Sequence, residues 1–174
     1  MRTLFLVLGL LFCGLSSSAQ KKMAGVGGEL SVLSLKPTTR MWFNKTTGLD
    51  LFAGVSAEFD DYKPNDYEGG IKYLHAFLYH RTSRTYLGGM AKWKWLKISE
   101  TSNTTNMPVF GLLIGKEWYK KKAGWKGFSV ELGYQYGVKD YDVFHPVTLD
   151  YVGKQRYDEF PLIVNLKYVF YRNR

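Results

Sequence analysis

Two long stretches near the carboxyl end of the sequence alternate between apolar and polar residues with a period of two. Residues 128–139 have apolar or aromatic side chains at every even position and small or polar ones at every odd position. Residues 160–170 repeat the apolar even positions, with a mixed set between them. Because successive side chains of a strand point to opposite faces, both stretches are predicted to be strands with one apolar face. Each is longer than an ordinary strand and matches the roughly 9–11 residues that cross a bilayer.

Six further segments show weaker versions of the same alternation. We expect strands at about 25–35, 38–44, 48–59, 70–81, 85–98 and 108–118. The connections alternate between short turns (44–47, 81–85, 119–127) and long loops (60–69, 99–108, 140–159), after a short first loop at Lys36-Pro37-Thr38. Short turns at one end and long loops at the other are typical of outer-membrane barrels. The predicted fold is therefore all-β, an eight-stranded antiparallel up-and-down transmembrane β-barrel.

The first nineteen residues have the features of a secretory signal peptide. Met1-Arg2 gives a positive start, residues 3–15 are apolar, and residues 16–19 are small. The apolar run is shorter than the ~20 residues of a membrane-spanning helix. We expect a cleaved signal peptide at 1–19 and a barrel domain at 20–174. Cys13, the only cysteine, would leave with the signal, so neither a disulfide nor a thiolate metal site is expected.

Charge is sorted between the two predicted ends of the barrel. The formal net charge is +9, yet the three long loops carry ten acidic residues against three basic ones. The opposite end is rich in Lys and Arg, as in residues 120–126. The basic excess therefore indicates one end of a barrel, and no nucleic-acid partner is predicted. The aromatic content of 17% suits side chains at a membrane interface.

This pattern resembles the small outer-membrane barrel families that contain the OmpA transmembrane domain and OmpX. The resemblance runs from Gly25-Val26-Gly27-Gly28 to the strand 160–170, and it is one of pattern rather than of a diagnostic motif. It implies a monomer in the outer membrane of a Gram-negative bacterium, in contact with membrane lipid and lipopolysaccharide. In these families the last strand usually ends on an aromatic residue, whereas here Phe170-Tyr171 is followed by Arg172-Asn173-Arg174.

Nine charged residues fall on the face that is predicted to line the barrel interior. The interior of an eight-stranded barrel is only wide enough for side chains, and an isolated buried charge costs several kcal/mol. We therefore predict that these residues form ion pairs that plug the lumen. They are Glu29, Arg40, Glu58, Lys92, Lys94, Glu117, Glu131, Lys139 and Lys167.

No motif predicts catalysis, a cofactor or a metal site. His75 and His80 have opposite parity on one predicted strand, and His145 lies in the last loop. Acyl chemistry needs a serine held by a histidine. The nearest arrangement, His80-Arg81-Thr82-Ser83, has no such pair on one strand face.

Three functions remain open on the sequence alone. The first, which we favour, is a structural or surface-interaction barrel that contacts a surface protein or ligand through outer-loop aromatic residues. The second is a secreted lipocalin-like barrel that binds a small apolar ligand and has its apolar face inside. The third is a barrel enzyme that modifies lipid A. The aromatic residues of the first hypothesis are Tyr62, Tyr67, Tyr141, Phe144 and Tyr151.

Overall fold

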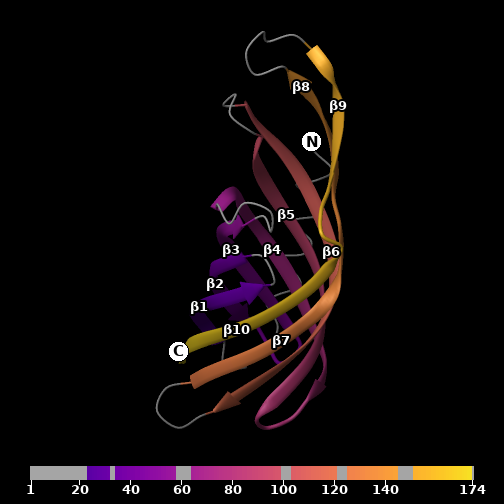
Figure 1. Ribbon diagram of the computed structural model, residues 1–174. Coiled ribbons are helices and arrows are strands. Elements are labelled where there is room, and N and C mark those ends of the chain that lie inside the picture. The colour runs from indigo at the N-terminus through magenta and orange to yellow at the C-terminus, as the bar shows by residue number, and fades with distance from the viewer. Residues whose placement is uncertain are drawn as a thin grey trace, which may run out of the picture.

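Eight strands of this chain close into an antiparallel barrel, as the computed structural model shows (Figure 1). It describes residues 23–31, 34–57, 64–98, 103–120, 125–144 and 151–173. The barrel order is β1-β10-β7-β6-β5-β4-β3-β2, so β1 pairs with both β2 and β10. The predicted all-β, eight-stranded antiparallel barrel is confirmed. The strands are β1 (Met23–Ser31), β2 (Ser34–Trp42), β3 (Thr47–Ala57), β4 (Pro64–Tyr79), β5 (Ser83–Ile98), β6 (Asn103–Lys120), β7 (Trp125–Tyr136), β8 (Val138–Phe144), β9 (Tyr151–Asp158) and β10 (Leu162–Asn173).

The two ends of the barrel differ. One end, here called the turn end, holds the β2–β3 and β4–β5 turns and the end of β10. From the other, the hairpin end, the β8–β9 pair projects beyond the barrel as a separate two-stranded sheet (Figure 1). No helix in the described part of the chain is long and apolar enough to cross a membrane.

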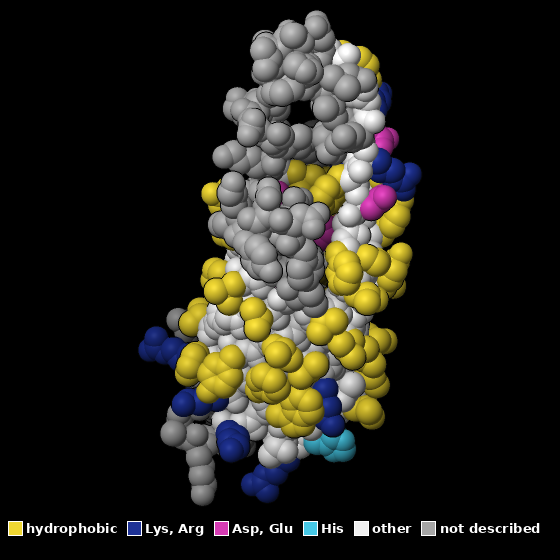
Figure 2. Space-filling view, viewed as in Figure 1, with side chains coloured by type: hydrophobic (Ala, Val, Ile, Leu, Met, Phe, Trp, Pro, Cys, Tyr) yellow, Lys and Arg dark blue, Asp and Glu magenta, His cyan; other side chains and the backbone are white. Residues whose placement is uncertain are grey.

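The period-two alternation of the sequence sorts the side chains between the two faces of the wall. Outward positions carry large apolar side chains, with Leu112 74% exposed and Tyr134 58% exposed. Inward positions carry all the buried charges together with an apolar cluster that includes Phe52, Leu74 and Ile163. Figure 2 shows hydrophobic side chains over the barrel wall and Lys and Arg side chains gathered at the lower end.

The segment 140–159, expected as a long loop, forms most of the β8–β9 hairpin instead. Its acidic residues suggested a loop, but the register places Asp140 opposite Arg156 and Asp142 opposite Lys154. Opposite charges at facing positions stabilise a strand pair, so the polar composition here is compatible with a hairpin.

Three of the barrel strands are also longer than expected. β4 and β5 have 16 residues each and β6 has 18. β2 begins at Ser34, so the proline at position 37 lies within the strand, at an exposed position. Proline has no backbone N–H to donate to a neighbouring strand, and for that reason the sequence suggested a loop there.

Candidate functional site

Among the residues that the structure describes, seven acidic and seven basic side chains lie in the barrel interior and pair with one another. Each of the fourteen residues is at most 9% exposed. The set is therefore electrically balanced, which matters because an unpaired buried charge costs several kcal/mol. The acids are Glu29, Asp50, Asp66, Glu68, Glu117, Glu131 and Glu159, and the bases are Lys36, Arg40, Lys72, Arg84, Lys92, Lys94 and Lys167.

Glu131 on β7 contacts several charged and polar side chains of the interior, which together are here called the central cluster. Nζ of Lys72 donates to its Oε2 at 2.7 Å, and Arg40 forms an ion pair with its Oε1. The Tyr86 hydroxyl donates to the same Oε1 at 2.8 Å. Gly115 gives the Tyr86 ring its room, because a Cβ there would lie 2.5 Å from Cζ of the ring. Glu131 thus joins β2, β4 and β5 across the lumen.

Two further carboxylates complete the central cluster. Glu29 Oε2 lies 2.6 Å from Nζ of Lys72 and 2.7 Å from Nζ of Lys167. Asp50 Oδ2 lies 2.8 Å from Nη2 of Arg40 and also pairs with Lys167. Each carboxylate contacts at least two cations, so the cluster is a network rather than a row of isolated pairs.

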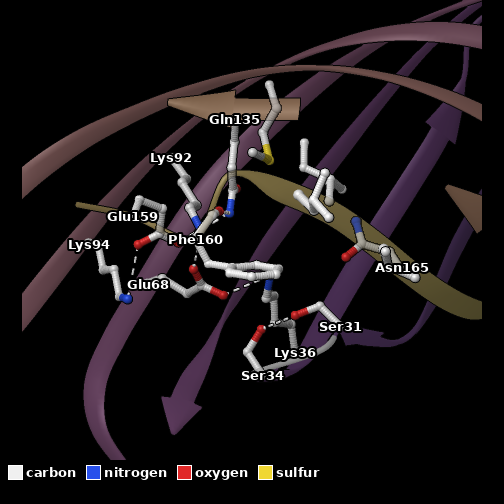
Figure 3. Close-up of a pocket in the computed structure, with 14 residues that line it drawn as sticks. Ser31, Ser34, Lys36, Glu68, Lys92, Lys94, Gln135, Glu159, Phe160 and Asn165 are labelled. Carbon is white, nitrogen blue, oxygen red and sulfur yellow. Dashed lines mark hydrogen bonds and ion pairs between the residues drawn. The ribbon is translucent and has the colours of Figure 1, made fainter. Parts of the chain in front are cut away.

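A second cluster of charged side chains lies at the hairpin end (Figure 3). Glu159, between β9 and β10, accepts from Nζ of Lys92 at 2.8 Å and Nζ of Lys94 at 3.1 Å. The two lysines also pair with Glu68 at 2.8 Å and Asp66 at 3.1 Å, respectively. Glu159 therefore binds the base of the β8–β9 hairpin to β5 inside the barrel mouth.

Tyr157 on β9 makes a further contact with Lys94. Burial raises the pKa of its phenol, so the hydroxyl stays protonated and its oxygen accepts from Nζ of Lys94 at 2.7 Å. The cavity beside this cluster, lined by Lys36 and Gln135 among others, measures about 30 Å³. That is room for about two water molecules.

Aromatic rings and one arginine fill the turn end. The Arg84 guanidinium lies 4.1 Å from the ring centroid of Trp42 and 4.9 Å from that of Tyr119. Its Nε lies 3.1 Å from Oε2 of Glu117, and the Tyr171 hydroxyl donates to the same carboxylate. Buried side chains thus occupy the lumen at both ends and in the middle.

The nine residues predicted to form lumen ion pairs fall into three groups. Lys139 lies in β8, half-buried and opposite Tyr157, outside the closed barrel, so it takes no part in the network. Glu58 lies outside the described residues. The structure places the others inside the barrel in ion pairs: Glu29, Arg40, Lys92, Lys94, Glu117, Glu131 and Lys167.

The aromatic residues expected in outer loops are placed differently. Tyr67 lies within β4, not in a loop, and is 64% exposed on the outer wall. Tyr151 lies in β9 and is 58% exposed. Tyr141 and Phe144 belong to β8, and their side chains, like the whole of Tyr62, lie outside what the structure describes.

Seven residues of the network were missed at the sequence level. Asp50 and Lys72 alternate with apolar neighbours, so strand parity alone could have found them. The other five were read as loop or turn residues because each lies near a predicted strand end. They are Lys36, Asp66, Glu68, Arg84 and Glu159.

The described histidines are exposed, His75 within β4 and His80 in the turn that follows it. Ser83, by contrast, is buried. Within the described ranges, no group of three or more His, Cys, Asp or Glu is arranged to hold a metal ion.

A solved structure shares this architecture. The crystal structure of the N-terminal β-barrel domain of Pseudomonas aeruginosa OprF matches with a TM-score of 0.60 at 12% sequence identity, over 88% of this chain and 98% of that one. At that identity the likeness establishes the fold, an OmpA-like eight-stranded barrel. No model of a known protein family and no curated protein matches the sequence.

Proposed function

We propose that this chain is an integral outer-membrane β-barrel that has a structural or surface-interaction role and a lumen closed by ion pairs. In this proposal the barrel carries no open pore and performs no catalysis. Its wall anchors the chain in lipid, and its β8–β9 hairpin is presented on the side of the membrane facing the cell exterior.

The observation that carries the proposal is the combination of an apolar outer wall with a charged interior. Leu112, Phe110 and Leu132 are 74%, 60% and 51% exposed, whereas Glu131 and Lys72 are fully buried. A soluble barrel that binds an apolar ligand needs the reverse arrangement, so this observation argues against the lipocalin alternative. A wall of this kind is suited to contact with lipid chains.

The ion pairs that cross the barrel interior support a barrel without a transport role. A water-filled pore needs a continuous polar passage, but here Arg40, Glu131 and Lys72 join opposite walls at the middle of the barrel. The positions of the histidines give no support to an enzyme that modifies lipid A, because both described histidines are exposed and the nearby Ser83 is buried.

Cell fractionation tests the proposal. The full chain, expressed in a Gram-negative host, should be recovered in the outer-membrane fraction. It should also migrate faster on a gel when unheated, because a folded barrel resists detergent unfolding. A soluble periplasmic protein followed in the same cells is the control. Recovery of this chain in the soluble periplasmic fraction or the medium would overturn the proposal.

A further inference from the structure

An aromatic row crosses three neighbouring strands on the outer wall near the turn end. The register places Trp118 of β6 opposite Phe128 of β7, and Phe128 opposite Tyr168 of β10. These side chains are 42%, 43% and 40% exposed, and the Trp118 and Phe128 rings stack with centroids 6.2 Å apart. They form one wall of a groove that also includes the β4–β5 turn.

Three cations line the same groove on the side nearer the barrel end. They are Arg81 in the β4–β5 turn, Lys120 at the end of β6 and Lys126 near the start of β7, all exposed. None of the three forms an ion pair with an acidic side chain in the described part of the chain. Glu117, close by in sequence, points into the lumen.

Two of these cations face each other on adjacent strands, which is unfavourable. Lys120 and Lys126 lie directly opposite each other on adjacent strands. Like charges at facing positions destabilise a strand pair. An anion bound between the two ammonium groups would remove that repulsion.

The outer wall beyond the aromatic row is mainly apolar and includes one further cation. The next outward positions of the same three strands are Lys116, Val130 and Leu166, and the following ones are Ile114, Leu132 and Val164. Nζ of Lys116 lies 5.3 Å from the ring centroid of Trp118. An occupant that fits both the cations of the groove and this wall needs a negative charge at one end and a long apolar portion at the other. A free phosphate would leave the aromatic row uncovered, and a nucleic acid would set polar sugar and phosphate against apolar wall.

We propose that this groove binds one anionic phospholipid from the membrane leaflet at the turn end. The lipid phosphate lies against Lys120, Lys126 and Arg81, and its acyl chains lie along Trp118, Phe128 and Tyr168. This inference rests on the proposed insertion of the barrel into a membrane. The combination of basic side chains and interfacial aromatic rings matches the chemistry that proteins use to bind anionic headgroups.

Native mass spectrometry of the refolded full chain in non-ionic detergent tests the inference. Phosphatidylglycerol is titrated in parallel with phosphatidylcholine of identical acyl chains. We expect one phosphatidylglycerol to bind in preference to phosphatidylcholine. The double variant Lys120→Gln with Lys126→Gln should lose about thirtyfold in affinity for phosphatidylglycerol, the effect of removing two cations at an anionic surface.

A matched control removes two other exposed cations from the same barrel end. Lys45→Gln with Arg172→Gln, at positions outside the groove, should keep the preference for phosphatidylglycerol. Equal loss in both double variants would show a general charge effect and overturn a defined site. Inorganic phosphate alone should not displace the lipid at equal concentration, and displacement would reassign the groove to free phosphate.

The heat-dependent gel shift, measured on the same samples, separates the two proposals. A folded, heat-modifiable barrel with no lipid preference would overturn this inference and leave the proposed function standing. A chain that neither folds in detergent nor shows the shift would contradict the proposed function itself.

Discussion

Glu131 shows how a single residue holds the barrel interior together. Its carboxylate is fully buried and contacts Arg40 and Lys72, and it accepts a hydrogen bond from the amide of Asn165 at 3.1 Å. Burial of a carboxylate is costly, but side chains from β2, β4 and β10 supply cations and donors that offset the cost. Removal of the Glu131 charge leaves Arg40 with Asp50 and Lys72 with Glu29, so the described interior then holds one more cation than carboxylates.

The first prediction follows for Glu131→Gln. The substitution keeps the side-chain volume but leaves excess positive charge in the lumen, so the free energy of unfolding should fall by about 3–5 kcal/mol. Urea titration of the barrel in lipid vesicles measures the change. Asp158→Asn, in the exposed Arg156–Asp158 pair, is the control and should have little effect. If both variants unfold at the same urea concentration as the parent, the ionic network is not a stabilising element.

The second prediction concerns the adjacent residue, which faces the opposite way. Leu132 is 51% exposed and lies opposite Ile114 and Val164 on the outer wall. Leu132→Arg should lower the unfolding free energy in vesicles by about 2–4 kcal/mol, because it places a charge near the membrane midplane. Leu132→Val, which remains apolar, is the matched control. Equal stability of the two variants would argue that this wall does not touch lipid.

Many of the individual interior residues could be predicted from the sequence, but not all of them. Strand parity placed Glu29, Arg40 and Glu131 on the inner face, since a period of two assigns each residue to one side. Parity cannot say where a strand ends, and for that reason Glu68 and Glu159 were assigned to loops. Their partners, Lys92 and Lys94, come from a distant part of the chain, which no local pattern reveals.

The β8–β9 hairpin is the element that most distinguishes this barrel from its predicted form. Its base is fixed by Glu159, whose backbone amide donates to the carbonyl of Gly137 at 2.9 Å and whose carboxylate holds Lys92 and Lys94. Local composition predicted a loop because acidic residues are uncommon in strands. The facing basic residues 154 and 156 make the hairpin possible, and that pairing is evident only once the two strands are in register.

The third prediction tests this anchor of the hairpin. Glu159→Gln removes two ion pairs, while Lys92 and Lys94 keep Glu68 and Asp66 as partners, so the barrel itself should stay folded. Backbone amides of β8 and β9 (138–144 and 151–158) should then exchange with deuterium about tenfold faster, the effect of losing a charged hydrogen bond. Asp158→Asn, at the neighbouring exposed position, should leave the exchange rates unchanged. Unchanged exchange in Glu159→Gln would mean that the hairpin is held by its backbone alone.

For the whole molecule, the alternation of the strands accounts for both the fold and the charged side chains of the interior. One strand parity supplies an apolar wall, and the interior of the described part of the chain holds seven acids and seven bases. The strand count fixes an interior of a size that side chains can fill. The architecture was therefore predictable from the sequence. The choice of ion-pair partners could not be predicted in the same way. It depends on the pairing of β1 with β10, which are far apart in the sequence.

Single-channel recording from the purified chain in planar lipid bilayers tests the central claim, that the ionic network closes the lumen. We expect the wild-type barrel to show no stable, large conductance. We expect the double variant Glu117→Ala with Glu131→Ala, in which Arg84, Arg40 and Lys72 lose carboxylate partners, to show brief small openings. A stable wild-type conductance that passes small solutes would contradict the account and make the protein a pore.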